Sequence, residues 1–254
     1  MQIIEDRRAL HRIPELELNL PKTMEYLNNA LSGLKCDLFS PIENSLCAYF
    51  DFGAENCVAF RADCDALPIC EQTGAEYAST HPGVMHACGH DAHTAMLLGA
   101  MALLSDMREA LTGKILFCFE SDEENGSGWP LLLPVLEGLD IDRCFAIHVL
   151  SSLEAGKLSI QPGGRMSGMV AVDAEFVGRG GHGSRPDLSV NPVFAAAAAL
   201  SNLAVASANR IDPGETLTLG ITAIQGGSAF NVIPDRARVL GTMRYFKRAI
   251  GQIA

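Results

Sequence analysis

The first 150 residues alternate between helical and strand-like patterns of apolar positions. Six segments stand out: helical patterns at 3–11 and 21–34, and strand-like runs at 46–52, 57–61, 114–119 and 144–150. The last two runs are continuously apolar, which is typical of strands that are covered on both faces of a sheet. Strands that alternate with helices predict an α/β fold with a mostly parallel sheet.

The pattern changes after residue 150. A short strand-like piece at 157–161 precedes Pro162-Gly-Gly164, which has the composition of a hinge. The remaining segments follow in the order β-α-β-β, at 169–176, 191–208, 216–223 and 237–245, and a helix is expected near Phe246. This order opens a β-α-β-β-α-β fold. We therefore expect a larger domain at 1–162 and a smaller α+β domain at 163–254 that lacks its last two elements.

Potential metal ligands are concentrated in Met85-His-Ala-Cys-Gly-His-Asp-Ala-His93. An apolar run of helical composition follows at 94–104, so this cluster is expected at a helix N-terminus. The helix dipole there favours anions and would help to hold Cys88 as a thiolate. Thiolate and neutral imidazole are the usual ligands of zinc-like metals. Taken alone, the stretch is also compatible with an ordinary loop and helix cap.

Polar side chains follow three of the predicted strands near their carboxyl ends. Asp63 and Asp65 follow one strand, Glu123 and Glu124 follow the next, and His148 lies near the end of the third. Ligands of α/β sheets gather at the carboxyl ends of the strands, so these groups predict one site. By itself, His148 is equally compatible with a core histidine, and the acidic run with a solvated loop. Their convergence is stronger evidence than any single motif.

These residue types suit metal-assisted hydrolysis if Cys88, His90, Glu124 and His148 bind metal. Adjacent side chains on extended backbone point in different directions, so Glu123 can face the substrate while its neighbour binds the metal. A carboxylate in that position can take a proton from the attacking water, whose pKa a metal lowers.

Other polar residues have two possible roles each. His182, in Gly180-Gly-His-Gly183, is a candidate donor to the oxyanion, and it is also compatible with an exposed turn histidine. Asp63 and Asp65 could orient the ligating imidazoles, or could cap the loop that follows them.

Five motifs are spread over nearly the whole chain: Leu10-His-Arg-Ile-Pro-Glu15, Arg61-Ala-Asp-Cys-Asp-Ala-Leu-Pro-Ile69, His81-Pro-Gly-Val-Met-His-Ala-Cys-Gly-His-Asp91, Gly180-Gly-His-Gly183 and Asn231-Val-Ile-Pro-Asp235. In this order they resemble the M20 peptidase family of metal-dependent amidohydrolases. The resemblance is to the branch with aminoacylase-like, hippurate-hydrolase-like and auxin-conjugate-hydrolase-like members.

The resemblance implies an enzyme that hydrolyses the amide bond of N-acyl amino acids or small peptides with two divalent metals per site, of zinc, manganese, cobalt or nickel. It implies a ferredoxin-like lid domain and a homodimer through that lid. It also implies a role for each candidate residue: metal ligands Cys88, His90, Glu124 and His148, general base Glu123, lid histidine His182, which would reach the partner subunit's site, and substrate contact Asn231.

The chain departs from the family pattern in two respects. Glu120-Ser-Asp-Glu-Glu-Asn125 stands where the family has Gln-Pro-Ala-Glu-Glu-Gly, so Glu120 and Asp122 add negative charge that could alter metal preference or substrate polarity. The family also continues for well over a hundred residues and supplies a further histidine ligand. From this we expect residues 1–254 alone to bind metal weakly and to lack turnover. The alternative function is an inactive fragment or a metal-binding, dimerising module.

Composition argues against several other classes of function. The net charge of −11 disfavours nucleic-acid and anionic membrane partners. The sequence has no apolar run of about 18 residues, and its N-terminus has no signal-peptide core. Eight scattered cysteines without an export signal predict a reducing cytoplasm rather than a disulfide framework. The zinc deaminase pattern His-x-Glu…Pro-Cys-x-x-Cys is absent from the sequence.

Overall fold

The computed structural model describes residues 2–253 and divides them into two compact units between Lys157 and Leu158. We call these unit 1 and unit 2 and describe each by itself. The predicted boundary lies slightly further along, after residue 162, and the roles of the units as catalytic and lid domains stay predictions. None of the helices in the described range is both long and apolar enough to cross a membrane.

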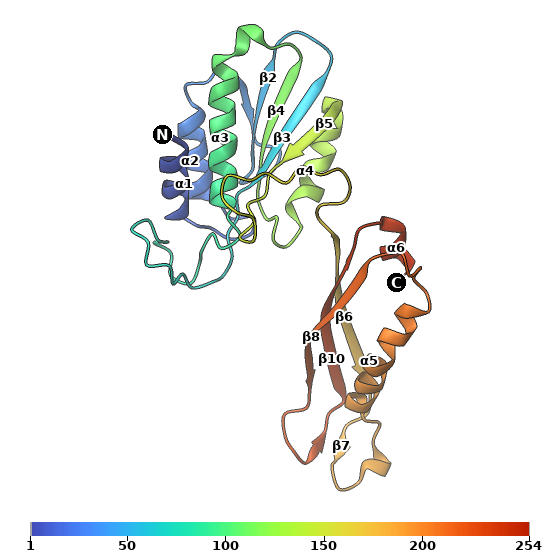
Figure 1. The fold of residues 1–254 in the computed structure, drawn as a ribbon. Coiled ribbons are helices and arrows are strands. Elements are labelled where there is room, and N and C mark those ends of the chain that lie inside the picture. The colour runs from blue at the N-terminus through green and yellow to red at the C-terminus, as the bar shows by residue number, and fades with distance from the viewer. Residues whose placement is uncertain (1, 254) are drawn as a thin grey trace. The chain divides into compact units, whose positions relative to one another are not determined.

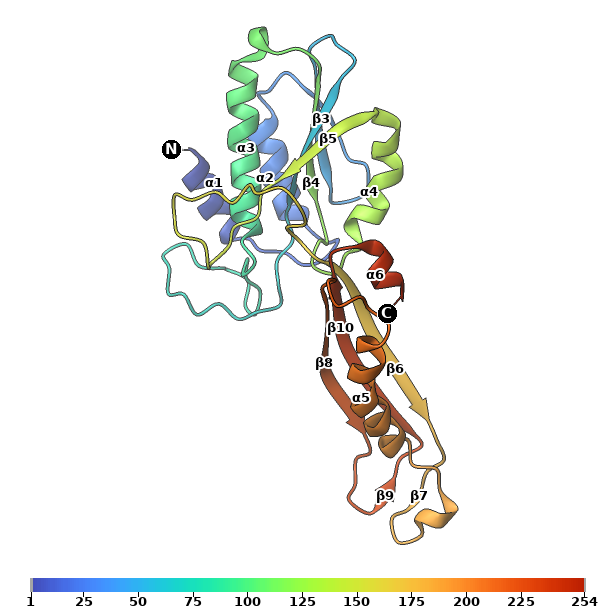
Figure 2. The ribbon, with the colours of Figure 1, turned by 45° about the vertical axis from the view of Figure 1, so that its right-hand side comes forward.

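Unit 1 is built on a five-stranded sheet with the order β1-β2-β4-β3-β5 (Figures 1 and 2). Its strands are β1 (Asp37–Phe39), β2 (Leu46–Asp51), β3 (Cys57–Asp63), β4 (Lys114–Glu120) and β5 (Ile141–Ala146). β3 is parallel to both β4 and β5, whereas β2 is antiparallel to β1 and β4. The predicted α/β class is therefore confirmed, with the parallel pairing confined to β4, β3 and β5.

Helices cover both faces of this sheet. The helices are α1 (Gln2–His11), α2 (Pro21–Leu31), α3 (His90–Asp106) and α4 (Gly128–Leu136), with short 3₁₀ helices η1 (Arg108–Ala110) and η2 (Glu137–Leu139). α2 and α3 pack on one face, α1 packs against α3, and α4 packs on the opposite face (Figure 1). This arrangement explains the apolar run of β4, because its alternate side chains meet different helices. Phe117 and Phe119 join the α2 and α3 side, and Leu116 and Cys118 join the α4 side.

The structure differs from the predicted elements at several points. The helix α4 and the strand β1 were not among the predicted segments. In α4, Pro130 lies in the first turn, where proline is tolerated, and Pro134 lies inside the helix. The strand predicted at 144–150 is instead β5 at Ile141–Ala146, since its pairing with β3 ends at Ala146. The segment at 157–161 forms no strand, and Ile160 is 86% exposed.

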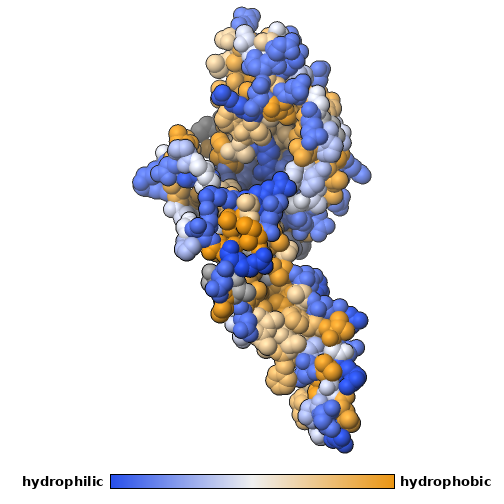
Figure 3. Space-filling model, turned by 90° about the vertical axis from the view of Figure 1, so that its right-hand side faces the viewer, coloured by the Kyte–Doolittle hydropathy of each residue, from blue (hydrophilic) through white to orange (hydrophobic). Residues whose placement is uncertain are grey.

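Large apolar side chains remain exposed on the α4 and β5 side of unit 1, and orange areas are visible on the face drawn in Figure 3. The exposed side chains include those of Trp129, Leu131, Phe145 and Ile147. Within the described chain, β5 pairs only with β3, so its other edge is open. An open apolar edge is the part of a sheet most prone to pair with a further strand.

Unit 2 contains a three-stranded antiparallel sheet with the order β6-β10-β8. Its elements are β6 (Gly168–Val177), β7 (Gly181–His182), η3 (Pro186–Leu188), α5 (Pro192–Ala208), β8 (Leu217–Gly226), β9 (Val232–Ile233), β10 (Arg236–Tyr245) and α6 (Arg248–Ile253). Ala196 of α5 packs against Ala237 and Val239 of β10. The main elements follow the predicted β-α-β-β order, and the full six-element lid stays a prediction.

Replacement of Phe117 by Ala should destabilise the protein by about 3–5 kcal/mol, the usual cost of truncating a buried phenylalanine. Phe117 is fully buried and stacks on Phe60 with a centroid distance of 5.4 Å. Urea unfolding of both proteins measures the difference. Leu103→Ala, at a position that is 65% exposed, should change stability by less than about 0.5 kcal/mol. Similar losses in the two variants would contradict this description of the core.

Candidate metal centre

Side chains from four segments of unit 1 meet at one edge of its sheet. The segments follow the carboxyl ends of β3, β4 and β5 and include the start of α3, and they carry Asp63, Asp65, Cys88, His90, Glu123, Glu124 and His148. Because β4, β3 and β5 are parallel neighbours, their carboxyl ends open onto the same edge. The structure thus brings together every candidate residue predicted in unit 1.

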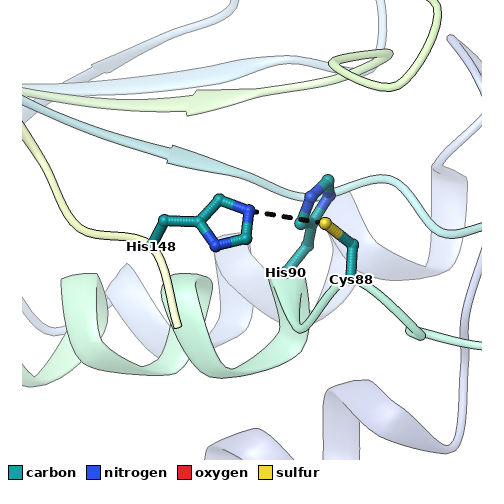
Figure 4. Close-up of side chains that lie close together, drawn as sticks. All are labelled: Cys88, His90 and His148. Carbon is teal, nitrogen blue, oxygen red and sulfur yellow. Dashed lines mark hydrogen bonds between the residues drawn. The ribbon is translucent and has the colours of Figure 1, made fainter. Parts of the chain in front are cut away.

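A close approach between two segments places Cys88 next to His148. Gly89 separates Cys88 from α3 and has a positive φ of 95°, which favours glycine. A Cβ atom on Gly89 would lie only 2.5 Å from the side chain of Val149, so no larger residue fits there without movement. Cys88 Sγ lies 3.4 Å from His148 Nε2, as Figure 4 shows. His148 Nδ1 donates a hydrogen bond to the Val149 carbonyl oxygen, which leaves Nε2 directed at the sulfur.

His90 is the most buried imidazole of the site. Its Nδ1 donates to Asp65 Oδ1 at 3.2 Å. Its Nε2 has no hydrogen-bond partner among residues 2–253, and the same holds for Glu124 Oε1, which lies 3.7 Å away. Two buried polar atoms that face each other in this way are satisfied by a cation between them. The residues of this site therefore fit a divalent metal.

The charge distribution around His90 points in the same direction. Burial alone would lower the pKa of His90, but its hydrogen bond to Asp65 and the nearby Asp63 carboxylate raise it to about 11. Burial raises the pKa of Glu124, and the charge of His90 opposes this effect. The carboxylates around His90 therefore stabilise a positive charge at this position, and either a proton or a metal ion can supply that charge.

Three groups of potential ligands lie within the described residues, with ligand atoms within 4.8 Å of one another in each group. Cys88, His90 and His148 form one, His90, Glu123 and Glu124 form the second, and Asp63, His90 and His93 form the third. His90 belongs to all three groups, so the potential ligands gather around its ring.

His93 also lies in this site, although the sequence pattern predicts no role for it. Its Nδ1 donates to Asp63 Oδ1 at 2.6 Å, and its Nε2 accepts the Val149 N–H at 2.9 Å. Both nitrogens are thus used, so His93 is a poor ligand although it lies near His90 and Asp63. It instead ties the segment that carries His148 to the end of β3. Its spacing of three residues from His90, which places both on one helix face, is the signal that could have found it.

The two aspartates after β3 contact the candidate ligands. Asp65 accepts the His90 ring N–H and, at 3.1 Å, the backbone N–H of Glu124. Burial would raise the pKa of Asp63, but its hydrogen bond to His93 and the nearby His90 and Arg61 hold it well below its usual range. These contacts are those expected of residues that orient metal ligands, and they support that role over the capping of a loop.

The two additional acids noted in the sequence have partners of their own. Arg61 donates to Glu120 at 2.6 Å and to Asp63 at 2.7 Å. Asp122 has a positive φ of 56° and accepts hydrogen bonds from the side chains of Asn125 and Ser127. Asp122 therefore stabilises the turn that presents the glutamate pair, and Glu120 is tied to Arg61 of β3.

His182 and Asn231 lie together in unit 2. His182 pairs with Val232 in the β7–β9 ladder, and Gly183 donates its N–H to the Asn231 carbonyl oxygen at 2.8 Å. His182 Nδ1 accepts the Ser184 N–H at 3.2 Å, so the proton of the neutral ring is on Nε2. That nitrogen is available as a donor.

Comparison with known families matches residues 59–251 to Peptidase family M20/M25/M40. The chain belongs to this family. It is 36% identical over 254 residues to an N-acyl-L-amino acid amidohydrolase of Geobacillus stearothermophilus, a match that covers 98% of this chain and 68% of the relative. It is 34% identical over 248 residues to an N-acetyl-L-cysteine deacetylase of Bacillus subtilis, a match that covers 96% of this chain and 59% of the relative.

The solved structures include a similar M20 protein. This is a dinuclear metal binding peptidase of the M20 family from Bacillus subtilis, with a TM-score of 0.80 and 31% identity, and the match covers 98% of this chain and 65% of that protein. This M20 chain thus spans between 59% and 68% of the lengths of these three relatives.

Replacement of Cys88 by Ala should weaken the binding of zinc or cobalt by more than the roughly 10–100-fold typical of losing a residue that only supports a ligand. Competition with a chromophoric chelator measures the dissociation constant. Affinity of the unaltered protein should fall as the pH drops, because protons compete with metal for the thiolate and imidazoles. Cys118→Ala, in the core beneath α4, is the matched control and should bind metal normally. Equal affinity of the Cys88→Ala protein would remove Cys88 from the ligand set.

Proposed function

We propose that this chain carries the metal centre of an M20 amidohydrolase that cleaves the amide bond of N-acyl amino acids or small peptides. The observation that carries the proposal is the buried pair of unpartnered atoms, His90 Nε2 and Glu124 Oε1, with a second carboxylate, Glu123, beside them. The names of the two relatives, which act on N-acyl amino acids and on N-acetyl-L-cysteine, support the substrate class.

In this proposal, the ligands are Cys88, His90, Glu124 and His148, and the site takes two divalent metals of zinc, manganese, cobalt or nickel. The dinuclear relative supports the number of two metals, and the gathering of candidate ligand atoms around His90 supports their place. A bound divalent metal would polarise the amide carbonyl and lower the pKa of the attacking water.

Glu123 is the general base of the proposed reaction. Its side chain is 41% exposed, more than that of Glu124, so it faces the space that a substrate would occupy. Its Oε2 lies 3.9 Å from His90 Nε2, close to the proposed centre. Glu123 takes a proton from the attacking water and then passes it to the amide nitrogen that leaves. Its neighbour Glu124 would bind the metal.

Unit 2 is the lid domain in this proposal. His182 donates from Nε2 to the oxyanion that develops on the carbonyl oxygen, and Asn231 contacts the substrate. The active assembly is a homodimer through the lid domain, in which His182 serves the site of the partner subunit. The compartment is the cytoplasm, which is consistent with eight cysteines that are all free.

In the chain extended to the length of its M20 relatives, replacement of Glu123 by Gln should preserve metal content and lower kcat by at least the roughly 10²–10⁴-fold of lost proton transfer. Hydrolysis of N-acetyl, N-benzoyl and dipeptide substrates with added manganese, zinc, cobalt or nickel measures activity, and elemental analysis measures the metal. Metal binding without hydrolysis by the unaltered protein would favour the alternative of a metal-binding, dimerising module. Near-normal turnover by metal-loaded Glu123→Gln protein would refute the role of the base.

Two inactive variants should complement each other if His182 acts across a dimer. A His182→Ala subunit keeps Glu123, and a Glu123→Gln subunit keeps His182, so a mixed dimer contains one intact site. With both variants made in the chain extended to the length of its M20 relatives, activity should therefore recover partly when the two proteins are mixed. Subunit exchange is followed independently by mass spectrometry of tagged subunits. Complete exchange without recovery would mean that His182 acts within its own chain or has no catalytic role.

A further inference from the structure

His11, the last residue of α1, is a buried histidine that bridges two carboxylates. Its Nδ1 lies 2.7 Å from Asp91 Oδ2, and its Nε2 lies 3.2 Å from Glu71 Oε1. Only 2% of its surface is exposed. Ionised carboxylates only accept hydrogen bonds, so both ring nitrogens donate and the ring carries a positive charge. The hydrogen bond to Asp91 is the main cause of a raised pKa of His11, which burial opposes.

The two carboxylates belong to the two segments that flank Cys88. Asp91 lies in the first turn of α3, directly after His90. Glu71 lies at the start of the loop at 70–86, which runs toward Cys88. His11 therefore connects both ends of the stretch that presents two of the proposed ligands. Arg7 adds a second link from α1 to Asp91, at 2.8 Å.

The residues after His11 bind the same loop through their backbone carbonyls. Arg12 accepts the N–H of Thr80, and Pro14 accepts a hydrogen bond from the ring of His81 at 2.5 Å. The motif that begins with His11 is thus attached to the loop at several points. None of these contacts is part of the proposed reaction, which leaves the motif without a role in the chemistry.

We propose that His11 is a positioning residue for the metal centre. Its two hydrogen bonds hold the loop and the first turn of α3 so that Cys88 and His90 present their ligand atoms to the same cation. The inference rests on the proposed metal centre. Without His11, Cys88 and His90 remain in the chain, but the segments that carry them lose a shared anchor. Ordering them again costs free energy that is then subtracted from metal binding.

Asn and Gln at this position separate the two hydrogen bonds. The amide nitrogen of Asn overlays the position of Nδ1 and can keep the bond to Asp91, whereas that of Gln overlays Nε2 and can keep the bond to Glu71. Leu keeps neither. Because the bond to Asp91 is the shorter and acts on the turn that contains His90, the Asn variant should retain more metal affinity than the Gln variant.

The matched control is Asp6→Ala. Asp6 is also a buried polar residue of α1, and it accepts hydrogen bonds from Gln2 and from Tyr26 of α2, each at 2.7 Å. Its loss should destabilise the packing of α1 without a direct effect on the loop at 70–86. It therefore measures what general destabilisation of this helix does to metal binding.

The experiment measures zinc affinity by chelator competition, the thiolate-to-cobalt charge-transfer absorption in the near ultraviolet, and thermal unfolding for all five proteins. We expect His11→Leu to bind zinc at least about tenfold more weakly, which is the loss typical of residues that support metal ligands. Its thiolate-to-cobalt absorption band should also be reduced. His11→Asn should recover most of the affinity and His11→Gln less. Asp6→Ala should lower the unfolding temperature and bind zinc normally.

Three outcomes would overturn the inference. Unchanged zinc affinity in His11→Leu would do so, and so would an equal loss of affinity in Asp6→Ala, which would make the effect one of general stability. If His11→Leu does not fold, equal affinities of the Asn variant, the Gln variant and the unaltered protein would overturn it. Failure of the unaltered protein to bind cobalt with a thiolate band is a separate result, because it would remove the proposed metal centre as well.

Discussion

Repulsion among the carboxylates at the ends of β3 and β4 is the constraint on which the arrangement of unit 1 depends. Two unit charges about 4 Å apart near a protein surface interact by about 4 kcal/mol. The net stability of a domain is only about 5–15 kcal/mol. The acids gathered here are Asp63, Asp65, Glu120, Glu123 and Glu124. They can share one edge only if cations or hydrogen-bond donors face them.

These acids differ in their hydrogen-bond partners. The acids proposed to support the metal ligands have donors facing them, whereas the glutamates proposed to bind metal or act as the base have few. Arg61 faces Asp63 and Glu120, while the imidazoles of His90 and His93 face the aspartates. The glutamate pair after β4 has no comparable donor among the described side chains, apart from the ring of His90. The negative charge that remains is therefore concentrated where a metal is proposed to bind.

Buried acids are also paired with cations outside the candidate metal centre. Asp91 is buried one residue beyond His90, and its charge is balanced by Arg7 and His11 from α1. The start of α3 thus has its acid, Asp91, paired on the α1 side and its proposed metal ligand, His90, on the sheet side. This is the route by which His11 is proposed to affect ligands that it does not touch.

Much of unit 1 could be predicted from local pattern, because burial of apolar faces acts over a few residues. The run at 115–119 is apolar throughout, and it lies in β4, which has helices on both faces. Prediction from the local pattern was wrong where contacts between distant residues decide the structure. The helix α4 was missed, although Leu132 packs into the core on that side of the sheet. The pairing of β5 with β3 ends at Ala146, before His148, and Val149 then donates its N–H to His93, a partner 56 residues away in the chain.

The sequence by itself determined the family, the α/β class and the list of candidate residues, since these depend on residue types and their order. Tertiary structure alone decided how those residues are used. His90 and His93 are the same residue type on one helix face, yet only His90 keeps a free nitrogen, because both nitrogens of His93 are bonded to Asp63 and Val149. His11 likewise gains its two carboxylates only when the chain folds. Hydrogen bonds between residues far apart in the chain leave no local pattern, so only the folded structure reveals them.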